Sequence, residues 1–91
     1  MPWPPLILYS KPGCHLCEGL AEKLQQIPEV RELEIRDITS NPLWWEQYSL
    51  EVPVLKVAGD PEQPLPRPSP RLTVAQLRSW LGQQLGGLSG G

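Results

Sequence analysis

The sequence has no run of basic residues, no long apolar stretch and no second pair of cysteines. Its 91 residues carry a net charge of −2, which argues against nucleic acid as the main partner. No stretch approaches the roughly 18 consecutive apolar residues that indicate a membrane-spanning helix. The first residues lack the basic region and the small-residue cleavage site of a signal peptide. Together these absences predict one small cytoplasmic domain that binds neither nucleic acid nor a membrane.

The two cysteines, Cys14 and Cys17, lie three positions apart. A bridge that closes so short a loop adds little stability through chain entropy, because that gain grows with loop length. A structural zinc site needs four ligands, and the two cysteines and His15 are the only soft candidates in the chain. The short loop therefore disfavours a stabilising structural disulfide, and the scarcity of cysteine and histidine disfavours a metal site. A redox dithiol and a pair of ordinary buried thiols remain open.

Apolar patterns alternate between strand and helix along the chain. Residues 5–10 form a continuous apolar run that suits a strand in the middle of a sheet, whereas residues 30–38 alternate with charges and suit an edge strand. The remaining expectations are a helix from the cysteine pair to Pro28, a helix at 41–48, a strand at 52–57, at most a short edge strand in the proline-rich segment 61–70, and a helix at 73–85.

This order predicts an α/β domain with a small sheet and helices on both of its faces. The first strand, helix and strand imply two parallel strands joined by a right-handed crossover. The domain is expected to span residues 1–85, and the glycine-rich residues 86–91 are expected to form a flexible tail. Trp44 and Trp45 are adjacent, so one is expected in the core and the other at the surface.

The cysteine pair falls where the first strand gives way to the first helix. Residues i and i+3 share a helix face, roughly 5–6 Å apart at Cβ, and unpaired N–H groups at a helix start favour a thiolate. Thiols in this setting have pKa values lowered to about 3.5–7.5. We therefore expect Cys14 to be the nucleophile and Cys17 the resolving thiol. His15 would favour the thiolate further as an imidazolium, or is simply an exposed residue of the first turn.

Two stretches resemble a known family. "LILYSKPGCHLCEGLAEKL" is similar to the start of glutaredoxins, and "EVPVLKV" resembles the cis-proline strand of the thioredoxin superfamily. The resemblance implies a thioredoxin fold, with a four-stranded mixed sheet flanked by three helices. It also implies a disulfide oxidoreductase, with Lys11 pairing with a glutathione carboxylate, the Val52 backbone pairing with a bound peptide or glutathione, and Pro53 as a cis-proline opposite the cysteines.

Two segments depart from the glutaredoxin pattern. His15 and Leu16 stand where glutaredoxins usually have Pro-Tyr or Pro-Phe, and "PRPSPRLT" replaces the Gly-Gly and acidic residue that hold the γ-glutamyl end of glutathione. Thioredoxins have tryptophan before Cys-Gly-Pro-Cys, whereas Gly13 precedes Cys14 here. Half of the glutathione site therefore has no counterpart in this sequence.

The sequence thus predicts a monomeric thiol–disulfide oxidoreductase without a tightly bound cofactor. Its partners are expected to be a disulfide-containing protein or small-molecule disulfide, with glutathione or a thioredoxin-type reductase as reductant. His15 is grouped with Lys11, Val52 and Pro53 as a substrate-binding residue. One alternative is a non-catalytic binding module that docks a partner through its proline-rich loop or Trp44. The other is a dimer that binds a metal or cluster through Cys14 and Cys17.

Overall fold

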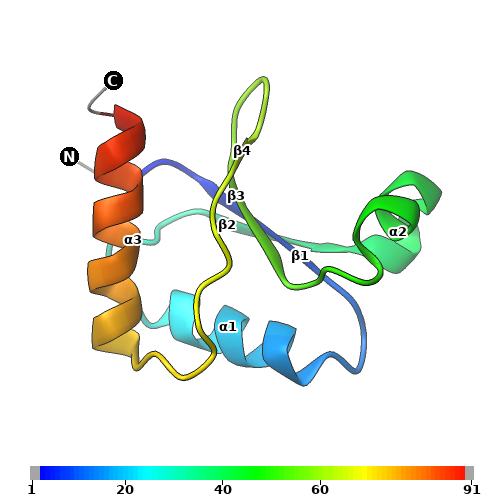
Figure 1. The fold of residues 1–91 in the computed structure, drawn as a ribbon, viewed down its shortest axis with the longest axis horizontal. Coiled ribbons are helices and arrows are strands. Elements are labelled where there is room, and N and C mark those ends of the chain that lie inside the picture. Colours follow the sequence, from blue (N-terminus) through cyan, green and yellow to red (C-terminus); the bar gives the residue numbers. More distant parts are fainter. Residues whose placement is uncertain (1–2, 90–91) are drawn as a thin grey trace.

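Strands and helices alternate along the chain in the computed structural model, which describes residues 3–89 (Figure 1). The elements, in chain order, are β1 (Leu6–Ser10), α1 (His15–Gln25), β2 (Leu33–Asp37), the 3₁₀ helix η1 (Ile38–Ser40), α2 (Pro42–Tyr48), β3 (Val54–Val57), β4 (Gln63–Pro64) and α3 (Val74–Ser89). The three predicted helices and the short edge strand in the proline-rich segment are confirmed.

The four strands form one mixed sheet in the order β2-β1-β3-β4. β1 runs parallel to β2 and antiparallel to β3, and β3 pairs antiparallel with β4. The apolar first strand therefore lies inside the sheet, and the charged strand β2 lies at its edge, as predicted. Sheet and helices together make the expected α/β fold of thioredoxin type.

β1 separates two apolar clusters, because successive side chains of a strand point to opposite faces. Leu6 and Leu8 join a cluster with residues of α1, β3 and α3. Ile7 and Tyr9 join a second cluster with Ile38 and, at its margin, residues of α2 and β3. All four of these β1 side chains are at most 3% exposed, which fits a strand buried on both faces.

Helix α3 begins with a capping box. The Thr73 N–H donates to Gln76 Oε1 at 2.9 Å, and the Gln76 N–H donates to Thr73 Oγ1 at 3.1 Å. The helix continues to Ser89, so its predicted end at residue 85 is wrong. The tail expected at residues 86–91 therefore begins inside the helix, and its last two residues lie outside the described part of the chain.

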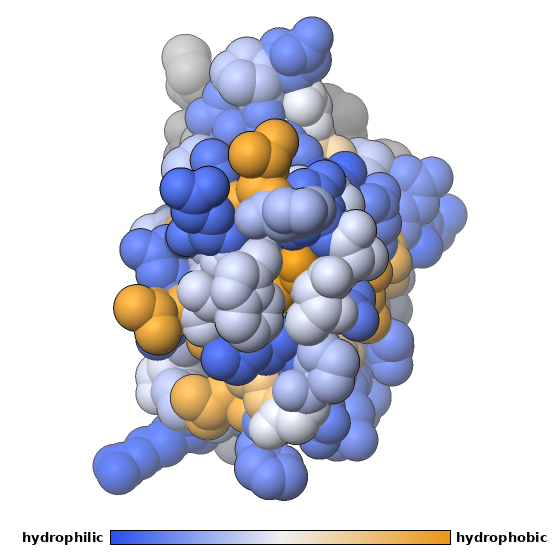
Figure 2. All heavy atoms as spheres, turned by 90° about the vertical axis from the view of Figure 1, so that its right-hand side faces the viewer, coloured by the Kyte–Doolittle hydropathy of each residue, from blue (hydrophilic) through white to orange (hydrophobic). Residues whose placement is uncertain are grey.

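The dithiol end of the molecule is formed by the start of α1 and by α2. Figure 1 shows both at the opposite end from the C-terminal part of α3. Figure 2, which views that end, shows separate apolar side chains among hydrophilic ones. The largest exposed apolar side chains of these segments are Leu16, Leu43, Trp45 and Leu50.

Candidate functional site

A tight turn delivers Cys14 to the start of α1. β1 ends at Ser10, and the Cys14 N–H donates to the Lys11 carbonyl at 3.2 Å across the turn. Gly13 adopts a φ of +79°, a left-handed conformation that glycine accepts without the steric cost of a Cβ atom. Cys14 then takes the N-cap position in an extended conformation. The sequence "KPG" thus positions the first cysteine at the helix N-terminus.

The two cysteines form a disulfide with a Cα–Cα distance of 5.3 Å. The Cys17 backbone N–H points at the sulfur of Cys14, with a distance of 3.2 Å from nitrogen to Sγ. Cys17 is 2% exposed, whereas Cys14 is only partly buried. Cys14 is therefore the more accessible sulfur, and its position lets a backbone donor stabilise negative charge on it.

His15 lies on the solvent side of the first turn. Its side chain is 94% exposed, and its Nδ1 lies 3.8 Å from the Glu18 carboxylate. That contact is an ion pair only when the imidazole is protonated. The predicted effect of His15 on the Cys14 thiolate stays a prediction.

Lys11 contacts α2 rather than open solvent. Its Nζ donates to the Ser49 carbonyl at 3.0 Å and lies 5.8 Å from the centre of the Trp45 ring. Ser49 caps the C-terminal end of α2, where a cation interacts favourably with the helix dipole. A glutathione carboxylate would have to share the amine with this carbonyl, so the glutathione role of Lys11 stays a prediction.

The peptide bond between Val52 and Pro53 is cis, as the resemblance implied. The Val52 N–H donates to the Tyr48 carbonyl at 3.0 Å. Among the described backbone hydrogen bonds outside helices and strands, none is accepted by the Val52 carbonyl. A substrate backbone would therefore find an acceptor at Val52, but would compete with Tyr48 for its donor. The expected pairing of the Val52 backbone with a peptide or glutathione stays a prediction.

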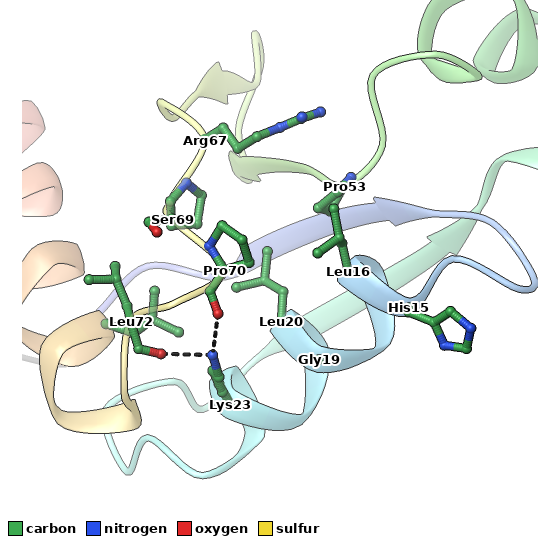
Figure 3. Close-up of a pocket in the computed structure, with 12 residues that line it drawn as sticks. His15, Leu16, Gly19, Leu20, Lys23, Pro53, Arg67, Ser69, Pro70 and Leu72 are labelled. Atoms are coloured by element: carbon green, nitrogen blue, oxygen red, sulfur yellow. Dashed lines mark hydrogen bonds between the residues drawn. The ribbon is translucent and has the colours of Figure 1, made fainter.

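A pocket of about 180 Å³ adjoins the cysteine pair (Figure 3). One wall is the exposed turn of α1 from His15 to Leu20, and the other is the proline-rich segment 67–72. Pro53 lies at the same opening, next to Leu16, and the His15 ring turns away from the pocket. Two predicted site residues, His15 and Pro53, thus line the pocket, whereas Lys11 contacts α2.

Lys23 holds the two walls of this pocket together. Its Nζ donates to the Pro70 carbonyl at 2.8 Å and to the Leu72 carbonyl at 2.7 Å. Sequence reasoning missed the roles of Lys23 and of the proline-rich segment, because the bonded residues are separated by 47 and 49 positions. The only local signal was Gly19, a glycine inside an otherwise regular amphipathic helix.

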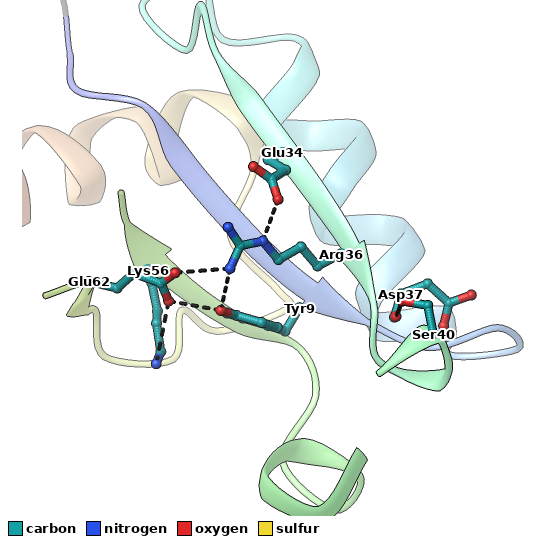
Figure 4. A network of polar contacts seen from close by, with 7 residues as sticks. All are labelled: Tyr9, Glu34, Arg36, Asp37, Ser40, Lys56 and Glu62. Carbon is teal, nitrogen blue, oxygen red and sulfur yellow. Dashed lines mark hydrogen bonds and ion pairs between the residues drawn. The ribbon is translucent and has the colours of Figure 1, made fainter. Parts of the chain in front are cut away.

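Sequence reasoning also missed a network of polar side chains on the face of the sheet that carries Tyr9 (Figure 4). Tyr9 Oη donates to Glu62 Oε1 at 2.8 Å, and Arg36 Nη1 donates to Tyr9 Oη at 2.7 Å and to Glu62 Oε2 at 2.9 Å. Lys56 Nζ lies 3.8 Å from the same carboxylate. The network links β1, β2 and β3 to the segment before β4, away from the cysteine pair.

Burial and hydrogen bonding shift the titration of this network. Burial raises the pKa of Tyr9 to about 12, and the hydrogen bond to Glu62 acts in the same direction. Burial acts to raise the pKa of Glu62 as well, but the hydrogen bonds from Tyr9 and Arg36 and the nearby positive charges hold it below its ordinary value. The carboxylate is thus stabilised in its charged form and the phenol in its neutral form.

The described residues, 3–89, have neither a membrane-spanning helix nor a cluster of metal-binding side chains. No helix in this range has the length and apolar character needed to cross a membrane. The same residues contain no cluster of three or more His, Cys, Asp or Glu side chains arranged to hold a metal ion.

The sheet order, the cis-proline and the cysteine pair at a helix start together define a thioredoxin-fold domain. A family model described as "Glutaredoxin-like domain (DUF836)" matches residues 5–82. The chain therefore belongs to this family of glutaredoxin-like domains. No curated protein matches it.

Solved structures of one bacterial protein share this fold. The chain is 28% identical to the X-ray structure of Northeast Structural Genomics target protein XcR50 from X. campestris, with a TM-score of 0.59 over 86% of this chain and 96% of that one. The solution structure of the same target gives a TM-score of 0.61 at 28% identity, over 87% and 94% of the two chains.

Proposed function

We propose that this protein is a thiol–disulfide oxidoreductase in which Cys14 attacks the substrate and Cys17 resolves the intermediate. The observation that carries the proposal is the Cys17 N–H directed at Cys14 Sγ at the N-terminus of α1. This donor and the helix dipole favour the thiolate form, which is the nucleophile in disulfide exchange. The different exposure of the two sulfurs supports the order in which they act.

The reaction consists of two exchanges. The Cys14 thiolate attacks one sulfur of a substrate disulfide, a mixed disulfide forms, and the other substrate sulfur leaves as a thiolate that takes up a proton. Cys17 then loses its proton and attacks Cys14 Sγ, which releases the second substrate sulfur as a thiol. The substrate gains two electrons and two protons, and the protein is left with the Cys14–Cys17 disulfide.

A second thiol system must return the protein to its dithiol form. Two molecules of a small thiol such as glutathione, or one dithiol of a reductase, supply the two electrons and two protons. Lys11 and Val52 are the proposed contacts for glutathione on the side of α2. The other side is formed by prolines 68 and 70, so any binding of glutathione there would differ from the Gly-Gly pattern of glutaredoxins.

Serine variants of the two cysteines test this proposal. We expect Cys14→Ser to lose reductase activity towards a protein disulfide by at least a factor of about 1,000, because serine cannot form the mixed disulfide. Cys17→Ser should keep the first exchange and accumulate the mixed disulfide on Cys14, which intact-mass spectrometry detects. The proposal is wrong if Cys14→Ser keeps full activity, or if Cys17→Ser traps no adduct.

A non-catalytic docking module is a second candidate, and the exposed apolar residues at the dithiol end favour it. Leu43 is 68% exposed, Trp45 is 47% exposed and Leu50 is 98% exposed. Trp44 instead packs edge-on against Tyr9, with ring centres 5.6 Å apart, so Trp45 replaces it as the exposed tryptophan. This candidate predicts ordinary thiols with a pKa near 8.5 in place of an activated Cys14.

A further inference from the structure

A glycine without a local structural reason lies in the wall of the pocket beside the dithiol. Gly19 is the fifth residue of α1 and has no left-handed φ. A Cβ atom added there would meet no heavy atom within 4 Å, so close packing does not require glycine either. Glycine inside a helix is unfavourable relative to alanine. What the missing side chain does leave is open space in the pocket.

The size and walls of the pocket suit a single apolar side chain. Its volume of about 180 Å³ is close to that of an engineered apolar cavity, about 150 Å³, that binds benzene. Pockets that enclose whole drug-sized ligands usually measure about 300–1,000 Å³. Figure 3 shows the Leu20 side chain pointing from α1 towards the proline-rich segment near Pro70, and Leu72 also lines the pocket. An aromatic ring or a large aliphatic group would replace water against these walls.

The ionisable residues around the pocket are all basic. They are His15, Lys23 and Arg67, and none of the described lining residues is acidic. Lys23 donates hydrogen bonds to the carbonyls of Pro70 and Leu72. Arg67 donates a hydrogen bond to the carbonyl of Glu51. A lysine or arginine side chain entering the pocket would meet like charge without a carboxylate partner. The charge distribution therefore disfavours a cationic occupant, and the preference for an apolar one rests on the leucine and proline walls.

The pocket lies within reach of a peptide attached to Cys14. Gly19 is five residues beyond Cys14, which corresponds to about 7.5 Å along the axis of a helix that rises 1.5 Å per residue. An extended peptide rises about 3.3 Å per residue, so a position one or two residues from the reacting cysteine would face the pocket.

We propose that this pocket is a specificity subsite for polypeptide disulfides, and that it receives a large apolar or aromatic side chain within two residues of the substrate cysteine. The inference rests on the proposed oxidoreductase function and adds the substrate class to it. Gly19 keeps the subsite open, and Lys23 holds its proline-rich wall against α1.

A peptide panel tests the subsite. Each peptide derives from Ser-Ser-Cys-Ser-Ser, carries phenylalanine at one of the four flanking positions, and has its cysteine in a mixed disulfide with 2-mercaptoethanol. The all-serine peptide is the reference. Reduced protein is mixed with each peptide, quenched with acid, and the rate of Cys14–Cys17 disulfide formation is followed by mass spectrometry. Peptide thiol and 2-mercaptoethanol are the reduced products, so the electrons balance.

The expected result is a rate about ten-fold or more above the reference for at least one phenylalanine peptide. Gly19→Leu should fill the pocket and reduce this preference to less than about two-fold. Gly86→Leu is the matched control, because Gly86 is also helical with open space for a Cβ atom and lies on α3, remote from the start of α1. It should keep the full preference.

Two outcomes overturn the subsite: equal rates across the panel for the natural protein, or an undiminished preference in folded Gly19→Leu. If Gly19→Leu does not fold, Gly19→Ala decides, since its smaller side chain should lower the preference measurably and a full preference would overturn the subsite. If the natural protein oxidises with none of the peptides, including the reference, the proposed function fails instead.

Discussion

At the scale of single residues, the chemistry available at the site depends on the hydrogen bonds that each polar group already makes within the protein. The sulfur of Cys14 receives a backbone N–H from its own helix, a contact between residues three positions apart. The predicted helix start at Cys14 had already indicated that unpaired backbone N–H groups would lie near this sulfur. The contact of Lys11 could not be predicted in this way, because its partner Ser49 is 38 positions away and caps the end of α2. A sequence motif could suggest a ligand for Lys11 but could not show that α2 occupies the amine.

Substitution of Lys11 separates its two roles. Lys11→Met removes the hydrogen bond to the Ser49 carbonyl, and we expect it to lower the free energy of unfolding by roughly 1 kcal/mol. For a domain of this size that corresponds to a fall in Tm of about 4–8 °C. Thermal denaturation measures the change. Arg31→Met is the control, because it removes the same charge from an exposed residue.

The same variant tests glutathione binding. If Lys11 also pairs with a glutathione carboxylate, KM for glutathione should rise several-fold in Lys11→Met and stay unchanged in Arg31→Met. Lower stability with an unchanged KM would leave Lys11 with a structural role alone. An unchanged Tm would contradict the structural role described here.

At the scale of elements, the charged network takes the place of a covering helix over part of the sheet. Arg36 from β2 and Lys56 from β3 lie over the Tyr9 ring, at 5.4 and 5.5 Å from its centre, and both approach Glu62. Residues 9, 36, 56 and 62 lie on four separate segments. The alternating pattern of residues 30–38 predicted the charged face of β2 but not its partners, since a period of two fixes direction and not register.

The network predicts a loss of stability in acid. The folded-state pKa of Glu62 lies below its unfolded value, so the unfolded chain binds the proton first as the pH falls. The stabilisation is therefore complete above about pH 4.5 and is lost as the pH falls through the folded-state pKa. Glu62→Gln should flatten this part of the curve of unfolding free energy against pH, measured by urea denaturation.

Glu46→Gln is the matched control for that measurement, because Glu46 is exposed on α2. Its curve should follow that of the natural protein. Tyr9 affects stability at alkaline pH, because its pKa is raised from 10.0 to about 12 in the folded protein. The unfolded chain therefore loses this proton first, and the free energy of unfolding should fall as the pH rises from 10 to about 12. An acid limb that is identical in Glu62→Gln and the natural protein would contradict the network's role.

At the scale of the whole molecule, local patterns predicted the order of elements and the positions of β1, β2 and β4 in the sheet. These patterns did not predict the C-terminal end of α3 or the pocket beside the dithiol. The glycine-rich end has little apolar surface to offset the entropy of ordering it, and the sequence therefore suggested that α3 ends at residue 85. Leu77, Leu81 and Leu85 all enter the core, and helices in proteins are stabilised mainly by such packing. Beyond Leu85 the helix continues through Gly86 and Gly87 to Ser89.

The pocket beside the dithiol arises in the same way. Its walls come from residues 15–23 and 67–77, together with Pro53 between them. The sequence indicated that "PRPSPRLT" lacks the glycines of a glutathione site, but only the fold shows that this segment closes over α1. The domain thus combines a dithiol that the sequence predicts with a neighbouring surface that it does not.

The pH dependence of Cys14 alkylation tests the central claim most directly. Reduced protein is treated with iodoacetamide from pH 4 to 10, and the rate at Cys14 is followed by mass spectrometry, with the urea-unfolded chain as reference. Because the thiolate is stabilised at the N-terminus of α1, the folded protein should reach half its maximal rate below about pH 7.5, whereas the unfolded chain should do so near 8.5. Superimposed curves for the folded and unfolded chains would contradict an activated Cys14 and favour the docking module.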